Sequence, residues 1–393
     1  MPRILLIYHS NICNKNCGIN SYLYNMFKIL NKNGFKIDIF VPDSFDDKWD
    51  IPAHSFVGEI FLDKERAIKK ITKDKNIFAY IRRRILKLTK RLLNENDSKK
   101  KSIDLKNKLN WINDYHIVRF KKVINDNKYD AVVFSYVYYS KLLDFIPSGI
   151  LKICSVSDFV SIQEMQQGNY KFGEVIEEEI SAIRKFDKAV FISSDEMGFF
   201  SNFIDEVEFS YLPHYLSLKE CKNITKDIDI LFVGSDNVHN MRGVNWFLEN
   251  VYPKIKDKRY DIVIAGKISA KIDQDKYGKI LFLDFVEDLD LLYSRVKIAI
   301  SPLKSGTGIK IKIIEAMAHH IPVVCTRNSL VGFMEKVNNG CVIADEADEF
   351  AKAINDILSD KELCAELSNQ AKEQCEKYYN EEYAEKTIAK IFK

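Results

Sequence analysis

The side chains best suited to chemistry lie between Ser301 and Thr326, in the sequence SPLKSGTGIKIKIIEAMAHHIPVVCT. An apolar run ends at Ser301, a glycine-containing turn follows, and the spacing predicts a helix from about Ile309 to His319 before Pro322 starts another strand. Every fourth residue of that helix is apolar, which predicts a buried stripe at Ile309, Ile313 and Met317. The other side carries Lys312, Glu315 and His319.

Two lysines at the start of this helix indicate a site for an anion. Lys310 and Lys312 lie where the helix dipole already places positive charge. A bound phosphate would remove this conflict, because Gly306 and Gly308 let a ligand approach the backbone amides. The spacing matches neither a P-loop nor a dinucleotide fingerprint. The alternative is an ordinary surface lysine pair.

Glu315 lies one helical turn beyond the glycine-containing loop and the two lysines. A carboxylate in that position can accept two hydrogen bonds from vicinal hydroxyls, such as those of a ribose. The alternative is a surface salt bridge between Glu315 and Lys312.

A second glycine turn opens an earlier stretch, LFVGSDNVHNMRGVNWFLENVYPKI. It predicts a strand, Gly234, a loop, and a helix from about Gly243 with Arg242 at its amino end. Arg242 is therefore a second candidate ligand for a diphosphate. The alternative is a surface arginine near a helix cap.

The elements that position these residues alternate between strand and helix. Apolar, β-branched runs predict strands at 4–8, 37–41, 131–134, 152–156 and 189–193. A helix from Ile19 to Asn33 should stop at Gly34, and another from Lys171 to Asp187 should expose the carboxylates of Glu177 to Glu179. This is the βαβ pattern of a parallel sheet.

The pattern stops and restarts at a polar stretch, Ser217 to Asp227, which we interpret as a linker. Further strands are predicted at 228–233, 261–265, 280–284, 298–301 and 323–325. The expected fold class is α/β, with two doubly wound, Rossmann-like domains facing each other across a cleft. The expected domains are 1–216, 217–379 and a closing helical segment, 380–393.

Composition fits a globular protein of two or three domains. The chain has 393 residues, of which 46% are hydrophobic and 29% charged, with only 15 Gly and 8 Pro. No apolar run reaches the roughly 18 residues that span a membrane, and the amino terminus does not resemble a signal peptide. The eight cysteines form no Cys-x-x-Cys pair, as in reduced intracellular proteins. We therefore expect a cytoplasmic location.

One segment carries most of the positive charge. Between residues 64 and 111, 17 Lys or Arg face 5 Asp or Glu, a balance of +12, so the rest of the chain carries −9 within a total of +3. Apolar residues between Ile77 and Leu93 recur at near-helical spacing around basic ones such as Arg82 to Arg84, which predicts a basic amphipathic helix. It could dock on the first domain or meet anionic lipid headgroups. Nucleic acid is a weaker alternative, since no stacking aromatics interleave with the charges.

These motifs resemble the donor-binding half of retaining glycosyltransferases of family 4, which have the GT-B fold. The resemblance is carried by VGS with NWFLENVYPKI, and by LFLDFVEDLDLLYSRVKIAISPLKSGTGIKIKIIEAMAHHIPVVCT, over about residues 228–333. Upstream, SVSDFVSIQEM and KFDKAVFISSDE resemble the first domain more weakly. The closing helix, Glu381 to Phe392, is similar to the tail that crosses back onto the first domain in this fold.

The resemblance implies roles for several residues. Glu315 matches the second acid of the Glu-x7-Glu motif and would hold the ribose of a nucleotide. The first acid falls at Thr307, a departure that leaves its role to the backbone amides of Gly306 to Ile309. The expected donor site therefore comprises Gly18, Gly234, Arg242, Phe285, Val286, Gly306, Thr307, Gly308, Ile309, Lys310, Lys312 and Glu315.

Within that site, Lys312 and Arg242 would neutralise the leaving diphosphate, and Phe285 and Val286 would border the nucleobase. His319 and His320 replace the small pair usual in the family, so we expect a reshaped helix end.

On the first domain, the family's glycine loop corresponds to Cys17 and Gly18. Asp158, just after a predicted strand, is the candidate acid for an acceptor hydroxyl, with a turn or cap residue as the alternative. His9, Cys13 and Cys17 match no standard metal spacing, and we expect neither metal nor cofactor. The implied catalytic residues are Asp158, Lys312 and Glu315.

The sequence thus predicts a retaining transferase that moves a sugar from a nucleotide diphosphate sugar to a hydroxyl of a glycan or lipid-linked glycan. It would act in the cytoplasm, in bacterial cell-surface polysaccharide or glycoconjugate synthesis. If the basic segment meets anionic lipid, it would be a peripheral protein on the inner face of the membrane. Two alternatives stay open. One is a GT-B nucleotide-sugar epimerase, and the other is a catalytically silent nucleotide-binding partner of another transferase.

Overall fold

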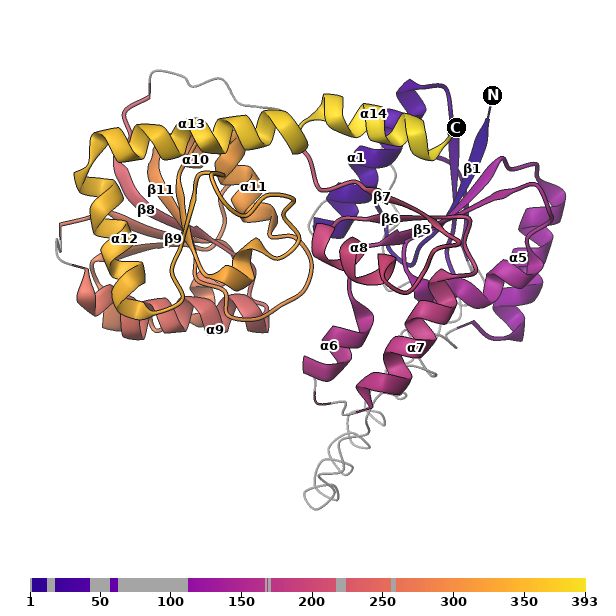
Figure 1. The fold of residues 1–393 in the computed structure, drawn as a ribbon, viewed down its shortest axis with the longest axis horizontal. Helices are drawn as coiled ribbons and strands as arrows, with labels where there is room; N and C mark the ends of the chain where they lie inside the picture. Colours follow the sequence, from indigo (N-terminus) through magenta and orange to yellow (C-terminus); the bar gives the residue numbers. More distant parts are fainter. Residues whose placement is uncertain are drawn as a thin grey trace, which may run out of the picture. The chain divides into compact units, whose positions relative to one another are not determined.

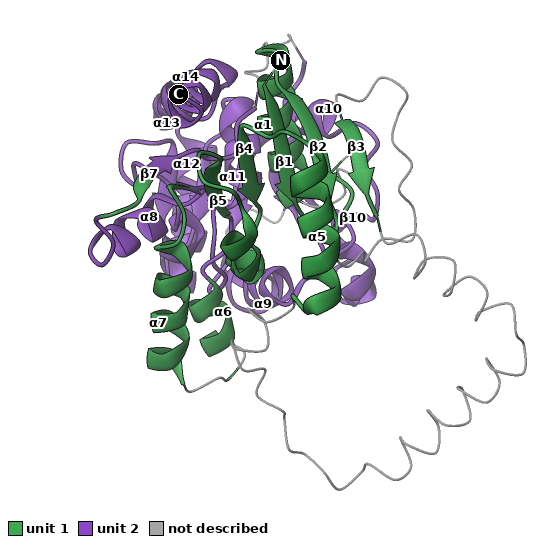
Figure 2. Ribbon diagram, turned by 90° about the vertical axis from the view of Figure 1, so that its right-hand side faces the viewer, with its two compact units in different colours: residues 1–156, 160–189, 206–208 green, residues 157–159, 190–205, 209–393 purple. Residues whose placement is uncertain are grey.

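The computed structural model describes residues 2–12, 18–42, 57–62, 112–166, 168, 171–216, 224–255 and 259–393. Its contacts define two compact units, shown in green and purple in Figure 2. The first comprises 1–156, 160–189 and 206–208, and the second 157–159, 190–205 and 209–393. Residues 217–223 of the expected linker and the whole basic segment 64–111 lie outside the described residues. The domain boundaries and the basic amphipathic helix therefore stay predictions.

The first sheet has seven strands in the order β3-β2-β1-β4-β5-β6-β7. Neighbouring strands from β3 to β5 pair in parallel. All of β4 and the last four residues of β1 and β5 are buried, as expected for strands that are covered on both faces. The strands are β1 (Arg3–Ile7), β2 (Lys36–Phe40), β3 (Val57–Phe61), β4 (Ala131–Phe134), β5 (Leu151–Val156), β6 (Lys188–Phe191) and β7 (Glu208–Tyr211).

Helices link these strands. They are α1 (Gly18–Lys32), α5 (Asp114–Asp126), the 3-10 helix η1 (Val137–Phe145), α6 (Val160–Gln166), α7 (Phe172–Ile183) and α8 (Ser194–Ser201). Gly34 follows α1 with φ of 86°, which confirms it as the helix stop.

One expectation for α7 is wrong. Glu179 was expected on an exposed face with Glu177, but Glu179 is fully buried. Its carboxylate accepts hydrogen bonds from the amides of Val160 and Ser161, at 3.0 and 2.9 Å. Those amides belong to the first turn of α6, where no helical carbonyl is available to them. Glu179 therefore caps another helix.

The second sheet has six strands in the order β10-β9-β8-β11-β12-β13, and every neighbouring pair is parallel. Its strands are β8 (Ile228–Val233), β9 (Ile262–Ala265), β10 (Ile280–Leu283), β11 (Val296–Ser301), β12 (Val323–Cys325) and β13 (Cys341–Ile343). Its α-helices are α9 (Val238–Trp246), α10 (Leu289–Ser294), α11 (Ile311–Ala318), α12 (Ala347–Ser359), α13 (Lys361–Tyr378) and α14 (Glu381–Ile391). Short helical turns are η2 (Phe247–Val251, a π-helix), η3 (Tyr252–Lys254), η4 (Ser269–Lys271), η5 (Gln274–Tyr277) and η6 (Arg327–Leu330).

Helices cover both faces of this second sheet. Alternate residues of β8 divide between two cores: Ile230 and Phe232 pack in the core that includes α9 and α12, and Leu231 packs in the core with α11 and α13. Figure 1 shows α9 and α13 on opposite sides of the sheet. This period of two is the pattern that buried strands impose, and it confirms the predicted α/β class.

All ten predicted strands are confirmed within two residues, but β3, β7 and β13 were not predicted. No helix among the described residues has the length and apolar character that crossing a membrane requires.

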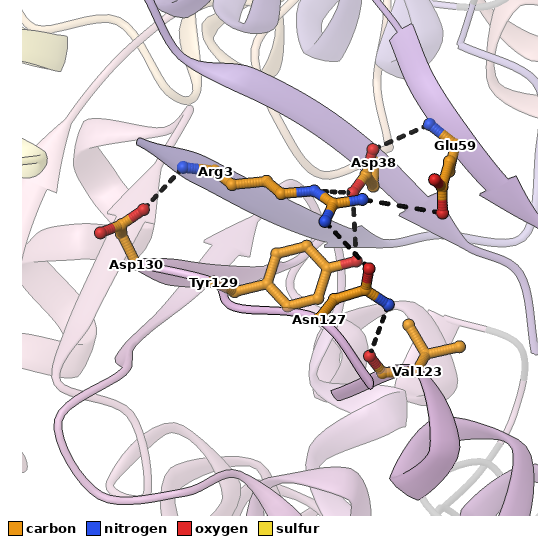
Figure 3. A network of polar contacts seen from close by, with 7 residues as sticks. All are labelled: Arg3, Asp38, Glu59, Val123, Asn127, Tyr129 and Asp130. Carbon is orange, nitrogen blue, oxygen red and sulfur yellow. Dashed lines mark hydrogen bonds and ion pairs between the residues drawn. The ribbon is translucent and has the colours of Figure 1, made fainter. Parts of the chain in front are cut away.

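A buried carboxylate ties three strands of the first sheet together (Figure 3). Asp38 on β2 is fully buried and accepts a 2.5 Å bond from Nε of Arg3 on β1. It also accepts from the Tyr129 hydroxyl at 3.1 Å and from the Glu59 amide on β3 at 2.8 Å. Arg3 donates as well to Oδ1 of Asn127 at 2.9 Å. Three donors therefore offset the desolvation of one charge.

Helix α11 ends in a Schellman motif. The amides of His320 and Ile321 donate to the carbonyls of Met317 and Ala316, each at 2.9 Å. His320 takes φ of 56°, the left-handed conformation that glycine favours. The helix thus ends as a glycine would end it, with a histidine in the left-handed position, and the expected reshaping relative to the family stays a prediction.

We expect Arg3→Met to lower the free energy of unfolding by about 3 kcal/mol, because it leaves the Asp38 carboxylate buried without its cation. The matched control is Arg184→Met, whose partner Glu206 is exposed, with side-chain exposures of 47% and 55%. That variant should lose less than about 1 kcal/mol. Urea unfolding of the full chain followed by circular dichroism measures both. Equal losses would contradict the role given to Asp38.

We expect His320→Gly to stabilise the chain by about 1 kcal/mol, because glycine adopts the left-handed conformation without a Cβ clash. His320→Ala removes the imidazole but keeps the Cβ, so it should not stabilise. Thermal unfolding of the three proteins makes the comparison. A stabilised alanine variant, or a destabilised glycine variant, would show that backbone strain is not the cause.

Candidate functional site

The predicted turn and helix lie where the sequence places them. β11 ends at Ser301, α11 begins at Ile311 rather than at Ile309, and Lys310 is its N-cap residue. The stripe of Ile309, Ile313 and Met317 is buried, as predicted. The opposite side of α11 therefore carries the polar side chains.

Lys312 is partly buried and points toward α9. Its Nζ donates to Oδ1 of Asn240 at 2.8 Å and lies 4.1 Å from the ring centroid of Phe232. The pKa of Lys312 is lowered to about 7, mainly by burial; the Glu315 charge opposes this shift and the Lys310 charge contributes to it. The ammonium is therefore poorly solvated, and an anion beside it would favour its charged form.

Glu315 is held by α10. Its Oε2 accepts a hydrogen bond from the Tyr293 hydroxyl at 3.0 Å. Burial raises the pKa of Glu315, while the Tyr293 bond and the Lys312 charge lower it. Lys312 and Glu315 are thus two partly buried opposite charges on one side of one helix.

Lys310 turns back onto the loop before it. Its Nζ donates to the carbonyls of Gly308, Thr307 and Gly306 at 2.7, 3.3 and 3.4 Å, and the residue is 8% exposed. Burial lowers the pKa of Lys310 to about 8, and the carboxylates of Glu196, Asp158 and Asp195 oppose the shift. Lys310 therefore organises the loop, whereas Lys312 faces α9.

The loop needs its two glycines. Gly306 and Gly308 have φ of 110° and 68°, and a Cβ on Gly306 would lie 3.3 Å from the His239 ring. His239 is fixed by a 2.8 Å hydrogen bond between its Nδ1 and Oγ of Ser305. The Gly308 amide donates to Oε1 of the buried Glu196 at 3.2 Å. One of the amides expected to replace the missing acid is thus already engaged.

The expected start of α9 is wrong. The helix begins at Val238, five residues before Gly243, because the Asn237 side chain accepts from the Asn240 amide and caps it. Arg242 is therefore an exposed residue within α9 and does not stand at its amino end. Its charge still reaches the loop: after burial, Arg242 and Lys310 both lower the pKa of His239. This local positive field favours anions.

Gly234 also lies close to this site. It follows β8, and a Cβ there would stand 2.8 Å from the ring of Phe232 and 3.2 Å from the Asn240 side chain. Those two residues hold Lys312. Gly234 therefore allows the tight packing beneath the lysine.

Phe285 and Val286 follow β10. Phe285 is 83% exposed, and Val286 packs against the core cluster that contains Ile313 and Met317 of α11. Val286 is thus on the same side of the second sheet as α11, and the neighbouring Phe285 exposes a large apolar ring to solvent.

Asp158 follows β5, is partly buried and groups with the second unit, where its charge acts on Lys310. Gly18 is the first residue of α1 in the first unit. Residues 13–17 lie outside the described residues, so the Cys17–Gly18 loop is not placed. Among the described residues, no three His, Cys, Asp or Glu side chains form a group that could hold a metal ion.

Sequence reasoning missed Tyr293, Asn240 and Glu196, which contact Glu315, Lys312 and the glycine loop. The position of Asn240 in the first turn of α9 could have been predicted from the sequence, because Asn237 three residues earlier is a strong N-cap signal. Tyr293 and Glu196 come from distant segments, and no spacing in the sequence connects them to the site.

Comparisons with known proteins find a family match over the part of the chain that carries this site. Residues 227–360 match the family model described as "Glycosyl transferases group 1". The "Uncharacterized 44.6 kDa protein in cps region" of Klebsiella pneumoniae is 26% identical over 273 residues, which cover 65% of this chain and 61% of that protein. The matched stretch therefore spans under two thirds of that relative.

Two solved structures are similar over the whole chain. Sucrose-phosphate synthase from Thermosynechococcus elongatus is 15% identical with a TM-score of 0.72, covering 100% of this chain and 98% of that one. A variant of S. aureus TarM, in complex with fondaparinux, alpha-GlcNAc-glycerol and UDP, is 14% identical with a TM-score of 0.69, covering 100% of both chains. Residues 227–360 are therefore similar to the group 1 glycosyltransferases, and the chain as a whole has the GT-B fold.

Proposed function

We propose that the chain is a retaining glycosyltransferase of family 4 that moves a sugar from a nucleoside diphosphate sugar to a hydroxyl of a glycan or lipid-linked glycan. The observation that carries the proposal is on α11 of the group 1 domain. There Lys312 and Glu315, partly buried on one side of the helix, adjoin a glycine loop in a positive local field. A cation and a carboxylate about one turn apart suit a diphosphate joined to a ribose.

Each side chain has one task in this proposal. Glu315 accepts the vicinal ribose hydroxyls, and Lys312 with Arg242 neutralises the diphosphate. The amides of Gly306, Thr307 and Ile309 contact the donor sugar in place of a carboxylate at Thr307, because the Gly308 amide is bound to Glu196. Phe285 and Val286 border the base.

The proposed reaction retains the configuration of the transferred sugar. The acceptor oxygen attacks the anomeric carbon from the side that the diphosphate leaves, the bond from that carbon to the phosphate oxygen breaks, and the acceptor proton passes to the leaving phosphate. The protein then supplies mainly positioned cations and amides, which stabilise the charge developing on the leaving group. Asp158 orients the acceptor hydroxyl. No metal ion is required in this scheme.

The relatives support the biological setting proposed here. The Klebsiella relative is described as lying in a cps region, and the TarM variant was solved with UDP and a GlcNAc-glycerol. We therefore propose bacterial surface polysaccharide or glycoconjugate synthesis, with the cytoplasm as location. The basic segment 64–111 would hold the chain at anionic lipid.

The test of the donor site is thermal-shift binding with UDP, GDP, ADP, CMP and dTDP. A nucleotide at about 100 times its dissociation constant should add about 2.7 kcal/mol of stability. Glu315→Gln and Lys312→Ala should abolish the shift, whereas Glu349→Gln and Lys304→Ala, at exposed positions of the same unit, should keep it. If no nucleotide stabilises the chain, the donor site is wrong. Conversion of the donor sugar to its epimer without transfer would favour an epimerase.

Nucleotide affinity should fall as the pH rises above about 7. The pKa of Lys312 is lowered to about 7, so below that pH the ammonium is already charged. Above it, binding of a diphosphate must restore the proton, at a cost of up to about tenfold in affinity per pH unit. Calorimetry of the wild-type chain in Tris and in HEPES should report proton uptake on binding at pH 8 and less at pH 6. Affinity independent of pH between 6 and 9 would contradict this role.

A further inference from the structure

Four side chains from two helices form a chain of three contacts that ends at Glu315. α10 supplies Asp290 and Tyr293, three residues apart, and α11 with its C-cap supplies Glu315 and His319, four residues apart. The Tyr293 hydroxyl donates to Oε2 of Glu315 at 3.0 Å, and the Tyr293 and His319 rings stack at 5.2 Å with an interplanar angle of 19°. Nε2 of His319 lies 3.1 Å from Oδ1 of Asp290. We call these four residues the tyrosine box.

The hydroxyl of Tyr293 has a definite direction. The residue is 2% exposed, so its hydroxyl must find a partner inside the protein, and that partner is Glu315. Burial, together with the Glu315 charge, raises the pKa of Tyr293 well above its usual value, so the phenol keeps its proton and donates it. One oxygen of the Glu315 carboxylate is thereby fixed.

The same bond favours the ionised carboxylate. Burial raises the pKa of Glu315, and the Tyr293 hydrogen bond is the first of the contributions that oppose this. A carboxylate offers about four lone-pair directions, so one bond to Oε2 leaves acceptor capacity for a pair of hydroxyls. Tyr293 thus sets both the orientation and the charge state of Glu315.

His319 and Asp290 hold the tyrosine ring in turn. Stacking against the His319 imidazole fixes the ring plane, and the Asp290 carboxylate fixes the imidazole. Asp290 lies on α10 with Tyr293, and His319 is the C-cap residue of α11, which carries Glu315. The tyrosine box therefore links α10 to α11 by two hydrogen bonds, Tyr293 to Glu315 and His319 to Asp290. A carboxylate held in this way loses less freedom when a ligand binds.

We propose that Tyr293 is the positioning residue for Glu315 and that His319 and Asp290 hold Tyr293 in place. The Glu315 carboxylate is then already oriented for the vicinal hydroxyls when a ribose binds. This inference rests on the proposed function, because it takes the ligand of Glu315 to be the ribose of a nucleoside diphosphate. The tyrosine box then contributes to ligand recognition as well as to packing.

The experiment compares two ligands on two variants. The probe is whichever of UDP, GDP and ADP binds the wild-type chain, paired with its 2′,3′-dideoxy analogue, which lacks both hydroxyls. Tyr293→Phe keeps the ring and its stack but removes the donor. We expect it to weaken binding of the natural nucleotide about tenfold and of the dideoxy analogue less than about twofold. Calorimetry measures both affinities.

His319→Ala should show the same selective loss to a smaller degree, and it carries the comparison if Tyr293→Phe does not fold. Tyr277→Phe, at a partly exposed tyrosine of η5, should bind both ligands as the wild type does. Thermal unfolding without ligand shows whether each variant is intact.

The outcomes separate this inference from the proposed function. Equal losses for the two ligands, or no loss for the natural one, would overturn the positioning role while the donor site stands. If none of the five nucleotides of the donor-site test binds the wild-type chain, the proposed function fails and this inference fails with it. If dTDP alone binds, only this inference fails, because a deoxyribose carries no vicinal hydroxyls.

Discussion

The structure around the candidate site depends on one constraint: two opposite charges on α11 are partly buried, and each must be satisfied by the elements around it. Lys312 obtains an amide oxygen from α9 and an aromatic face from β8. Glu315 obtains a phenol from α10. Removing charges from water is expensive, so the positions of α9 and α10 against α11 follow from this requirement as much as from apolar packing. The side chains that stabilise the charges also orient them for a ligand.

The loop before α11 solves a related problem with the backbone. Lys310 binds three successive carbonyls, Glu196 accepts the Gly308 amide, and glycines take the left-handed conformations that such a turn demands. The conformation of the loop is therefore held by two side chains: Lys310, which belongs to the loop's own segment, and Glu196, which is buried and comes from α8. It stands where the resembled family has an acidic side chain, at Thr307. Contact with the donor sugar through amides, in place of a carboxylate, is the consequence that we propose.

The sequence predicted the sheets and the core of the site because both depend on local rules. Buried parallel strands such as Ala131–Phe134 read as continuous apolar runs, and the four-residue spacing from Ile309 to Met317 identified the buried side of α11. β13 is three residues long and only partly buried, and it was missed, whereas β12 is equally short but fully buried and was predicted. The predicted start of α9 at Gly243 was five residues late, although Asn237 is a residue type typical of N-caps.

Other features depend on contacts between distant segments. Glu179 belongs, by periodicity, to an exposed acidic face, yet it caps α6 nineteen positions away. Lys310 and Lys312 are alike in sequence, but one turns into the loop and the other toward α9. Tyr293 precedes Glu315 by 22 positions and contacts it only because β11 returns the chain between α10 and α11. No local pattern encodes such pairs.

The central claim is that the ribose and diphosphate of a nucleotide bind at α11 of the second unit. The most direct measurement is a crystal structure of the chain with the nucleoside diphosphate that binds it. We expect both ribose hydroxyls to lie within hydrogen-bond distance of the Glu315 carboxylate. The phosphates should lie beside Lys312 and the amides of the glycine loop. A nucleotide bound elsewhere, or one whose ribose turns away from Glu315, would contradict it.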